Sequence, residues 1–285
     1  MKPNIDLVAE FRKLLDSCDN ENSIQDFLEK HAELIPLPFL AGHQLHQSAV
    51  ISKLPIGNSF ICDLAYLTKC SDYWNIVFIE LEKPTKKIFL ESQENVRTRA
   101  EFNQAYEQVQ SWKAYLENSN HLDELKKRIS KLMGDGLITR IPFYARYVLI
   151  YGRSEEKNSS EKRIELFNQK NTESILVKTY DSIISEYLAK PIIPKMILTL
   201  WKDNGFQIKN IPEQNLEMSL LGYLNSDFIK FDKNIKNKLI SQGYCIEQWE
   251  KGNLLTQDGG KLDKQTKINS LPPNNLIRRI LESEK

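Results

Sequence analysis

The 285-residue sequence has little of what several protein classes require. Its four cysteines are scattered without a CxxC pair, which argues against a zinc site or a disulfide scaffold. No apolar run approaches the roughly 18 residues of a membrane span, and acidic residues interrupt the N-terminal stretch, unlike a signal peptide. The formal net charge of +1 gives no overall attraction to nucleic acid, so any such site must be a local patch. We therefore expect a cytoplasmic protein with reduced thiols.

Hydrophobic residues make up 41% of the chain and charged residues 27%, a balance typical of globular domains. Apolar residues recur at helical spacing over 5–17 and 23–35, and the period changes to two between 44 and 83. That middle region predicts three antiparallel strands, in "HQSAVISKL", "SFICDLAYLT" and "WNIVFIELEK". Helical patterns then alternate with the apolar runs "FYARYVLIYGR" and "ILVKTY". The predicted fold class is mixed α/β.

Two prolines within "KPIIP", residues 190–194, predict a boundary between a domain of residues 1–190 and another of residues 191–285. In the second part we expect helices near 213–225 and 232–243, followed by two short strands joined at Lys251–Gly252. The stretch "LLTQDGG" resembles the tail of winged-helix domains, which contact DNA with a helix and a wing. A helical appendage that packs on the first domain is an equally good interpretation.

Three acidic residues occupy the second and third predicted strands. Asp63 lies within an apolar run, and Glu80 and Glu82 end the next one. Because side chains alternate along a strand, Glu80 and Glu82 should share a face while Lys83 points away. If these strands pair, Asp63 lies across from Glu80. Three carboxylates on one face repel one another unless a cation separates them, and such oxygen ligands suit Mg²⁺ or Mn²⁺.

The order of the motifs resembles one known group of nucleases. The segments that carry the resemblance span roughly residues 23–188 and are "FLEKHAELI", "ICDLAYL", "FIELEKP", "NQAYEQVQSWKAYL", "YVLIYGR", "RIELFNQKN" and "TYDSII". They resemble the Shedu family of bacterial anti-phage defence proteins, within the PD-(D/E)xK nuclease superfamily. The resemblance implies a restriction-endonuclease-like core, DNA as substrate, Asp63 and Glu80 as metal ligands, and Gln108 reaching the site from a helix. It also implies a homo-oligomer and suggests a phage-derived trigger.

The chain departs from the usual (Asp/Glu)-x-Lys motif at one position. Glu82 occupies the place of the lysine, and the lysine stands one residue later, at Lys83. We expect Glu82 to act as a general base or as a third metal ligand. Lys83 cannot simply replace the missing lysine, because it faces the other side of the strand unless a bulge rotates it.

Simpler interpretations exist for each of these residues. Asp63 alone could be an acid at a strand edge, Glu80 and Glu82 could be solvated beside Lys83 and Lys86, and Gln108 could pack beside Trp112. The substitution at Glu82 also favours a degenerate nuclease fold that binds DNA or a phage component without cutting. The expected function is a Mg²⁺-dependent deoxyribonuclease, with this DNA-binding sensor as the alternative.

Overall fold

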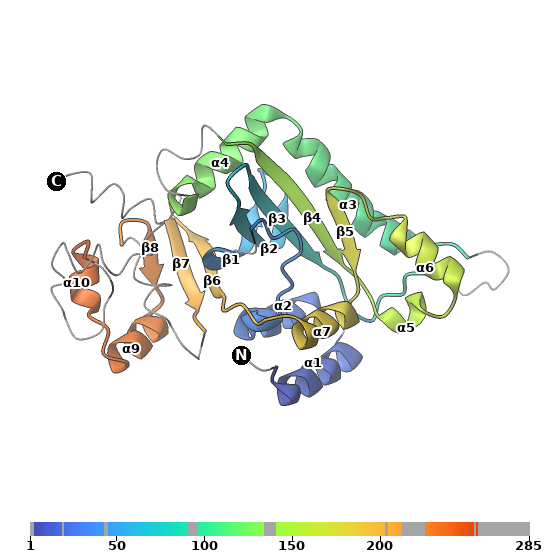
Figure 1. Ribbon diagram of the computed structural model, residues 1–285, viewed down its shortest axis with the longest axis horizontal. Coiled ribbons are helices and arrows are strands. Elements are labelled where there is room, and N and C mark those ends of the chain that lie inside the picture. The colour runs from blue at the N-terminus through green and yellow to red at the C-terminus, as the bar shows by residue number, and fades with distance from the viewer. Residues whose placement is uncertain are drawn as a thin grey trace.

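A computed structural model describes residues 3–18, 20–42, 45–90, 96–133, 141–202, 205–212, 226–253 and 255 of the chain (Figure 1). It shows a mixed α/β fold built on one eight-stranded sheet, with strand order β5-β4-β3-β2-β1-β6-β7-β8. The strands are β1 (Leu45–Pro55), β2 (Ile61–Lys69), β3 (Trp74–Leu81), β4 (Phe143–Ile150), β5 (Ile175–Lys178), β6 (Met196–Trp201), β7 (Gly205–Asn210) and β8 (Ile229–Phe231). The predicted fold class is confirmed.

The three predicted antiparallel strands form the middle of the sheet. β1 pairs with β2 and β2 with β3, both antiparallel, whereas β4 joins β3 in parallel and β5 joins β4 in parallel. Seven of the eight residues of β3 are buried, which fits its nearly continuous apolar sequence and its central position. Strand β3 is therefore a rigid support for the acidic residues at its end.

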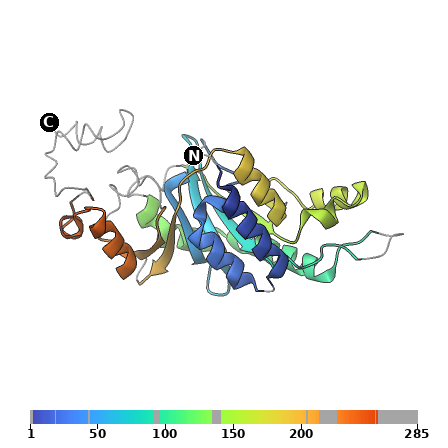
Figure 2. The same ribbon diagram turned by 90° about the horizontal axis from the view of Figure 1, so that it is seen from below.

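Helices cover both faces of the sheet (Figures 1 and 2). One face packs against α3 (Ala100–Leu116) and α4 (Ser119–Met133), whose apolar side chains join those of Ile76 and Phe78 in one core. The other face packs against α1 (Ile5–Ser17), α2 (Glu21–Lys30), the 3-10 turn Ala32–Leu34 and α7 (Tyr180–Ala189), around Val77 and Ile79. Helices α5 (Ser154–Lys157) and α6 (Glu161–Asn168) lie between β4 and β5 in the chain.

Helix α2 begins at Glu21, earlier than the helical spacing over residues 23–35 predicts. The side chain of Asn20 caps the helix by accepting a hydrogen bond from the backbone of Asn22. Asparagine is among the residues best suited to satisfy free amides at a helix start. The extra residues at the start bring Glu21 toward the end of β3.

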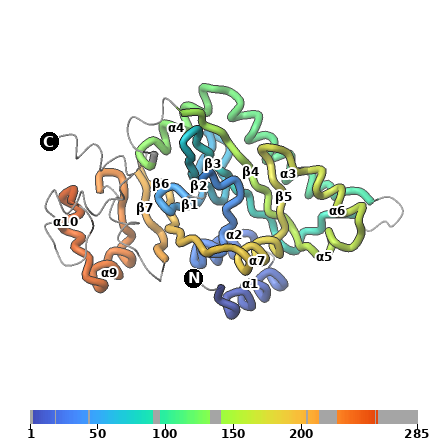
Figure 3. Tube along the Cα trace, in the orientation of Figure 1, coloured from blue at the N-terminus to red at the C-terminus, as the bar shows by residue number. Residues whose placement is uncertain are grey.

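The sheet continues across the predicted boundary at residues 190–194. Strand β6 pairs with β1 in parallel, so residues 196–199 lie beside residues 49–52, far away in the sequence (Figure 3). Met196, Ile197 and Leu198 are fully buried. The boundary between residues 1–190 and 191–285 was predicted from a change in composition and stays a prediction. The hydrogen-bonded sheet contains strands from both sides of it.

The C-terminal part differs in detail from the sequence expectations. Helix α9 (Lys233–Ser241) confirms the helix expected near 232–243. Residues 246–250 form helix α10 (Ile246–Glu250) where we expected a strand, so the strand prediction was wrong there. The helix expected near 213–225 and the "LTQDGG" stretch, apart from Leu255, lie outside the described residues. No helix in the described part of the chain is long and apolar enough to cross a membrane.

One buried residue of β6 tests whether the sheet unfolds as a unit. Leu198→Ala should destabilise the protein by about 2–5 kcal/mol, because it leaves a cavity in the core shared with β1. Scanning calorimetry should show one transition at a lower melting temperature. Leu188→Ala, at a side chain that is 40% exposed, is the control and should change little. Two transitions, of which only the smaller one moves, would instead establish a separable C-terminal unit.

Candidate active site at the ends of three strands

The pairing of β2 with β3 brings Asp63 and Glu80 together. The antiparallel register pairs Leu64 with Ile79, so the next position along it sets Asp63 opposite Glu80. The carboxylates are close enough for Asp63 to raise the pKa of Glu80. The expectation that these two acids face each other across the strands is therefore fulfilled, although their role in metal binding stays a prediction.

In both β1 and β2, the alternation of side chains between the two faces of the sheet is interrupted near Lys53 and Asp63. Ile51 and Leu54 of β1 belong to the same core although they are three residues apart, and Lys53 between them has a left-handed backbone, with φ of 50°. The pairs Ser52–Leu64 and Leu54–Cys62 flank it, which sets Lys53 opposite Asp63. Left-handed backbone at a non-glycine residue is disfavoured and is often found at functional sites.

Asp63 is held at both of its carboxylate oxygens. Its Oδ2 accepts a hydrogen bond of 2.7 Å from the backbone amide of Leu81, and its Oδ1 lies 2.5 Å from Nζ of Lys53. The Asp63 side chain is 15% exposed and that of Lys53 is 47% exposed. Burial alone would lower the pKa of Lys53, but the hydrogen bond and charge of Asp63 outweigh this effect and raise it. Lys53 is therefore a cation beside the acids.

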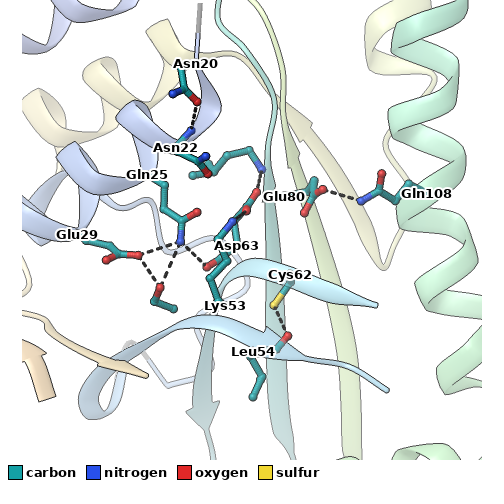
Figure 4. A network of polar contacts seen from close by, with 12 residues as sticks. Asn20, Asn22, Gln25, Glu29, Lys53, Leu54, Cys62, Asp63, Glu80 and Gln108 are labelled. Carbon is teal, nitrogen blue, oxygen red and sulfur yellow. Dashed lines mark hydrogen bonds and ion pairs between the residues drawn. The ribbon is translucent and has the colours of Figure 1, made fainter. Parts of the chain in front are cut away.

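Glu80 contacts helix α3 through Gln108, as the family resemblance implied (Figure 4). Nε2 of Gln108 donates to Oε1 of Glu80 over 2.6 Å, while Oε2 of Glu80 is buried without a hydrogen-bond partner. Burial first, and then the charges of Asp63 and Glu82, raise the pKa of Glu80 to about 9. A buried carboxylate with one free oxygen next to a second carboxylate is poorly stabilised by the protein alone.

Glu82 has different partners from Glu80. Strand β3 ends at Leu81, and the Glu82 side chain accepts a hydrogen bond from Lys86, which also lies 3.5 Å from Glu21 at the start of α2. Burial raises the pKa of Glu82 although Lys86 opposes the shift. The backbone oxygen of Glu82 accepts a hydrogen bond of 2.6 Å from the hydroxyl of Tyr180. Glu82 is near enough to raise the pKa of Glu80, and its role as a base or third metal ligand stays a prediction.

The donor set at Asp63 and Glu80 fits a small divalent cation. Both residues offer hard carboxylate oxygens as ligands. A bound cation would give the unpartnered Oε2 of Glu80 a partner and would reduce the repulsion between the two acids. Within the described ranges, no group of three His, Cys, Asp or Glu side chains is arranged to hold a metal ion. Because Mg²⁺ keeps several waters and often binds through one or two carboxylates plus substrate phosphate, two acids suffice.

Lys53 is the residue of this site that the sequence did not reveal. It stands in "ISKLP", where period-two alternation gives it no special face. Its position depends on the left-handed backbone at residue 53 and on the register with Asp63, and both follow from tertiary structure. The signal available in the sequence was a lysine within an otherwise apolar strand that pairs with the Asp63 strand.

The raised pKa of Glu80 predicts a pH dependence for the metal-free protein. Folded Glu80 keeps its proton up to about pH 9, whereas in the unfolded chain it loses the proton near its ordinary value of 4.5. The folded state therefore binds more protons over this interval, and the free energy of unfolding should fall as the pH rises, by at most about 1.4 kcal/mol per pH unit. Urea unfolding in EDTA between pH 5 and 9 measures this slope. Glu80→Gln should flatten it, and equal slopes in both proteins would contradict the assignment.

Comparison with known proteins gives the family of the chain. A family model described as "Shedu protein SduA, C-terminal" matches residues 19–184, which is more than half of the chain and includes Asp63, Glu80 and Gln108. No curated protein matches the sequence. The family suggests a protein of a Shedu defence system. The chain belongs to the Shedu SduA C-terminal family.

Proposed function

We propose that the protein is a metal-dependent DNA endonuclease of the PD-(D/E)xK type that acts in bacterial defence against phage or other foreign DNA. The observation that supports this most is the cluster at the strand ends, where Asp63 and Glu80 lie side by side with Lys53 on one acid and Gln108 on the other. Two acids, a lysine and a polar helical side chain are the groups needed to hydrolyse a phosphodiester.

Asp63 and Glu80 would hold Mg²⁺ or Mn²⁺. Such an ion, when bound, polarises a phosphodiester oxygen and favours attack by water. The hydrogen bond from the Leu81 amide fixes the direction of the Asp63 carboxylate, and Gln108 does the same for Glu80. Held in this way, the two acids need little rearrangement when the ligand arrives, which favours catalysis.

Lys53 would supply the positive charge that the usual lysine of the motif provides. Its ammonium group is fixed 2.5 Å from Asp63 and is 47% exposed, so it can also meet a phosphate oxygen. Because its pKa is raised, it acts as a cation that stabilises developing negative charge and does not accept a proton. If Lys53 has this role, Glu82, which was predicted to be a base or a third metal ligand, does not have to replace the lysine of the motif.

The wider assembly belongs to the same proposal. Two active sites can cut both strands of duplex DNA in one binding event, which is the reason to expect a homo-oligomer. A phage-derived trigger would explain how a nuclease of the host is kept from its own DNA. Both follow from the family resemblance and are proposed on that basis.

One observation favours the alternative, a fold that binds DNA without cutting it. The ammonium group of Lys53 already neutralises part of the acidic pair and occupies Oδ1 of Asp63. If Lys53 replaces the metal instead of assisting it, the cluster is stable without a divalent ion. A thermal shift with Mn²⁺ distinguishes the two, since a ligand that binds the folded state raises the melting temperature.

The proposed activity is tested by nicking of supercoiled plasmid with Mg²⁺ or Mn²⁺. Asp63→Asn and Glu80→Gln should each reduce the rate by about 10²-fold or more, because metal assistance contributes several kcal/mol to such reactions. Both variants should also lose the thermal shift with Mn²⁺. Glu165→Gln, at an exposed acid of α6, is the matched control and should cut normally. Wild-type protein that binds DNA but neither cuts it nor responds to Mn²⁺ would support the alternative.

A second set of variants separates Lys53 from Glu82. Lys53→Met should reduce cleavage by about 10²–10³-fold while DNA still binds, because it removes one preorganised charge near the phosphate. Glu82→Gln should change the rate less than tenfold, since Glu82 is paired with Lys86. Lys83→Met serves as the control. If Glu82→Gln abolished cutting and Lys53→Met did not, Glu82 would be the base or ligand that the sequence suggested.

A further inference from the structure

A buried polar network around Gln25 and Glu29 lies beside the candidate site (Figure 4), and Lys209 connects it to strand β7. At its centre lies Glu29 of helix α2, whose side chain is 9% exposed. Oε1 of Glu29 accepts hydrogen bonds from Nε2 of Gln25 at 2.8 Å and from Oγ of Ser52 at 2.5 Å. Oε2 accepts one from Nζ of Lys209 at 2.6 Å. Neither Glu29 nor Lys209 is part of the acidic pair at the strand ends.

The donors around Glu29 keep it ionised. Burial alone would raise the pKa of Glu29, but the hydrogen bonds from Lys209, Ser52 and Gln25 outweigh burial and lower it. A buried charge is tolerated when it is paired and fully hydrogen-bonded, and it becomes costly when one partner is removed. Among the three donors, Lys209 is the cation, so it supplies the counter-charge.

The same network reaches two of the three strands that carry the site, β1 and β2. Nε2 of Gln25 also lies 3.4 Å from the backbone oxygen of Asp63, and Ser52 directly precedes Lys53, the residue with the left-handed backbone. Glu29 is therefore linked to β1 through Ser52 and to β2 through Gln25, next to the ion pair of Lys53 with Asp63.

Strand β7 supplies a second contact to the same helix. Nδ2 of Asn210 donates to the backbone oxygens of Glu29 at 2.8 Å and of Lys30 at 3.0 Å, at the end of α2. Strand β7 follows the segment that the family model matches, which ends at residue 184. The C-terminal part of the sheet thus contacts the core of the protein directly behind the site.

We propose that Lys209 is a positioning residue for the active site: it holds the Glu29 carboxylate, which fixes Ser52 beside Lys53 and, through Gln25, the backbone of Asp63. The inference rests on the proposed nuclease function. Without Lys209, Glu29 would be a buried anion held by the neutral groups of Gln25 and Ser52, and such a charge is costly. The network would rearrange to relieve it, and Lys53 and Asp63 would lose their alignment with Glu80.

The test compares Lys209→Met with wild-type protein for plasmid nicking and for the thermal shift with Mn²⁺. Outer residues that orient metal ligands typically change metal affinity or activity by about 10- to 100-fold. We therefore expect Lys209→Met to lower kcat by about that factor with little change in KM. Lys209→Arg keeps the charge and should restore most of the activity. Lys236→Met is the control. It breaks the ion pair of a similarly exposed lysine with Glu250, far along the chain, and should have no effect.

A double variant separates positioning from mere support of the fold. In Glu29→Gln/Lys209→Met the unpaired buried anion is gone, so this protein should cut faster than Lys209→Met alone when each variant is assayed well below its melting temperature. A role in stability alone would leave kcat of Lys209→Met at the wild-type value under those conditions and lower only its melting temperature, and that result would overturn the inference. So would unchanged kcat and Mn²⁺ response in Lys209→Met beside an active wild type.

These outcomes are distinct from failure of the proposed function. A wild-type protein that neither cuts DNA nor gains stability from Mn²⁺ removes the nuclease proposal, and the role of Lys209 with it. If the wild-type protein is active and Lys209→Met is equally active, only the proposed role of Lys209 is ruled out.

Discussion

Repulsion between two partly buried carboxylates, those of Asp63 and Glu80, is the constraint that the surrounding structure has to satisfy. Like charges in a low-dielectric environment are tolerated when donors and cations surround them or when one acid keeps a proton. The protein uses both solutions. Lys53 and the Leu81 amide stabilise the charge of Asp63, and the raised pKa of Glu80 keeps that acid protonated over the neutral range. Each of these groups comes from the end of a central strand.

Much of this arrangement followed from the sequence, because it depends on alternation and pairing. Asp63 and Glu80 face each other since β2 and β3 are adjacent antiparallel strands, and both were evident as apolar period-two runs. Gln108 was placed by resemblance to a family, and it donates a hydrogen bond to Glu80, while its role in catalysis stays a prediction. The fold class followed from the succession of helical and strand patterns.

The remaining features depend on local geometry that periodicity does not encode. Lys53 reaches the site because its backbone is left-handed, and no glycine or asparagine in the sequence indicated that conformation. Glu82 follows the last residue of β3 and forms an ion pair with Lys86, a contact that alternation does not predict. Strand β6 follows two prolines that indicated a boundary, yet it pairs in parallel with β1, about 150 residues earlier in the chain. Such long-range pairing is set by packing and topology.

The edges of the sheet restrict how copies of this protein can associate. The outermost strands are β5, with four residues, and β8, with three, so each presents few free backbone groups to a neighbouring chain. Short edge strands are a common protection against uncontrolled pairing between sheets. In the described part of the chain, a continuous intermolecular sheet would therefore have little backbone on which to grow. Contacts between copies would instead have to be made by side chains on helices and loops, where surface charge and shape decide the partner.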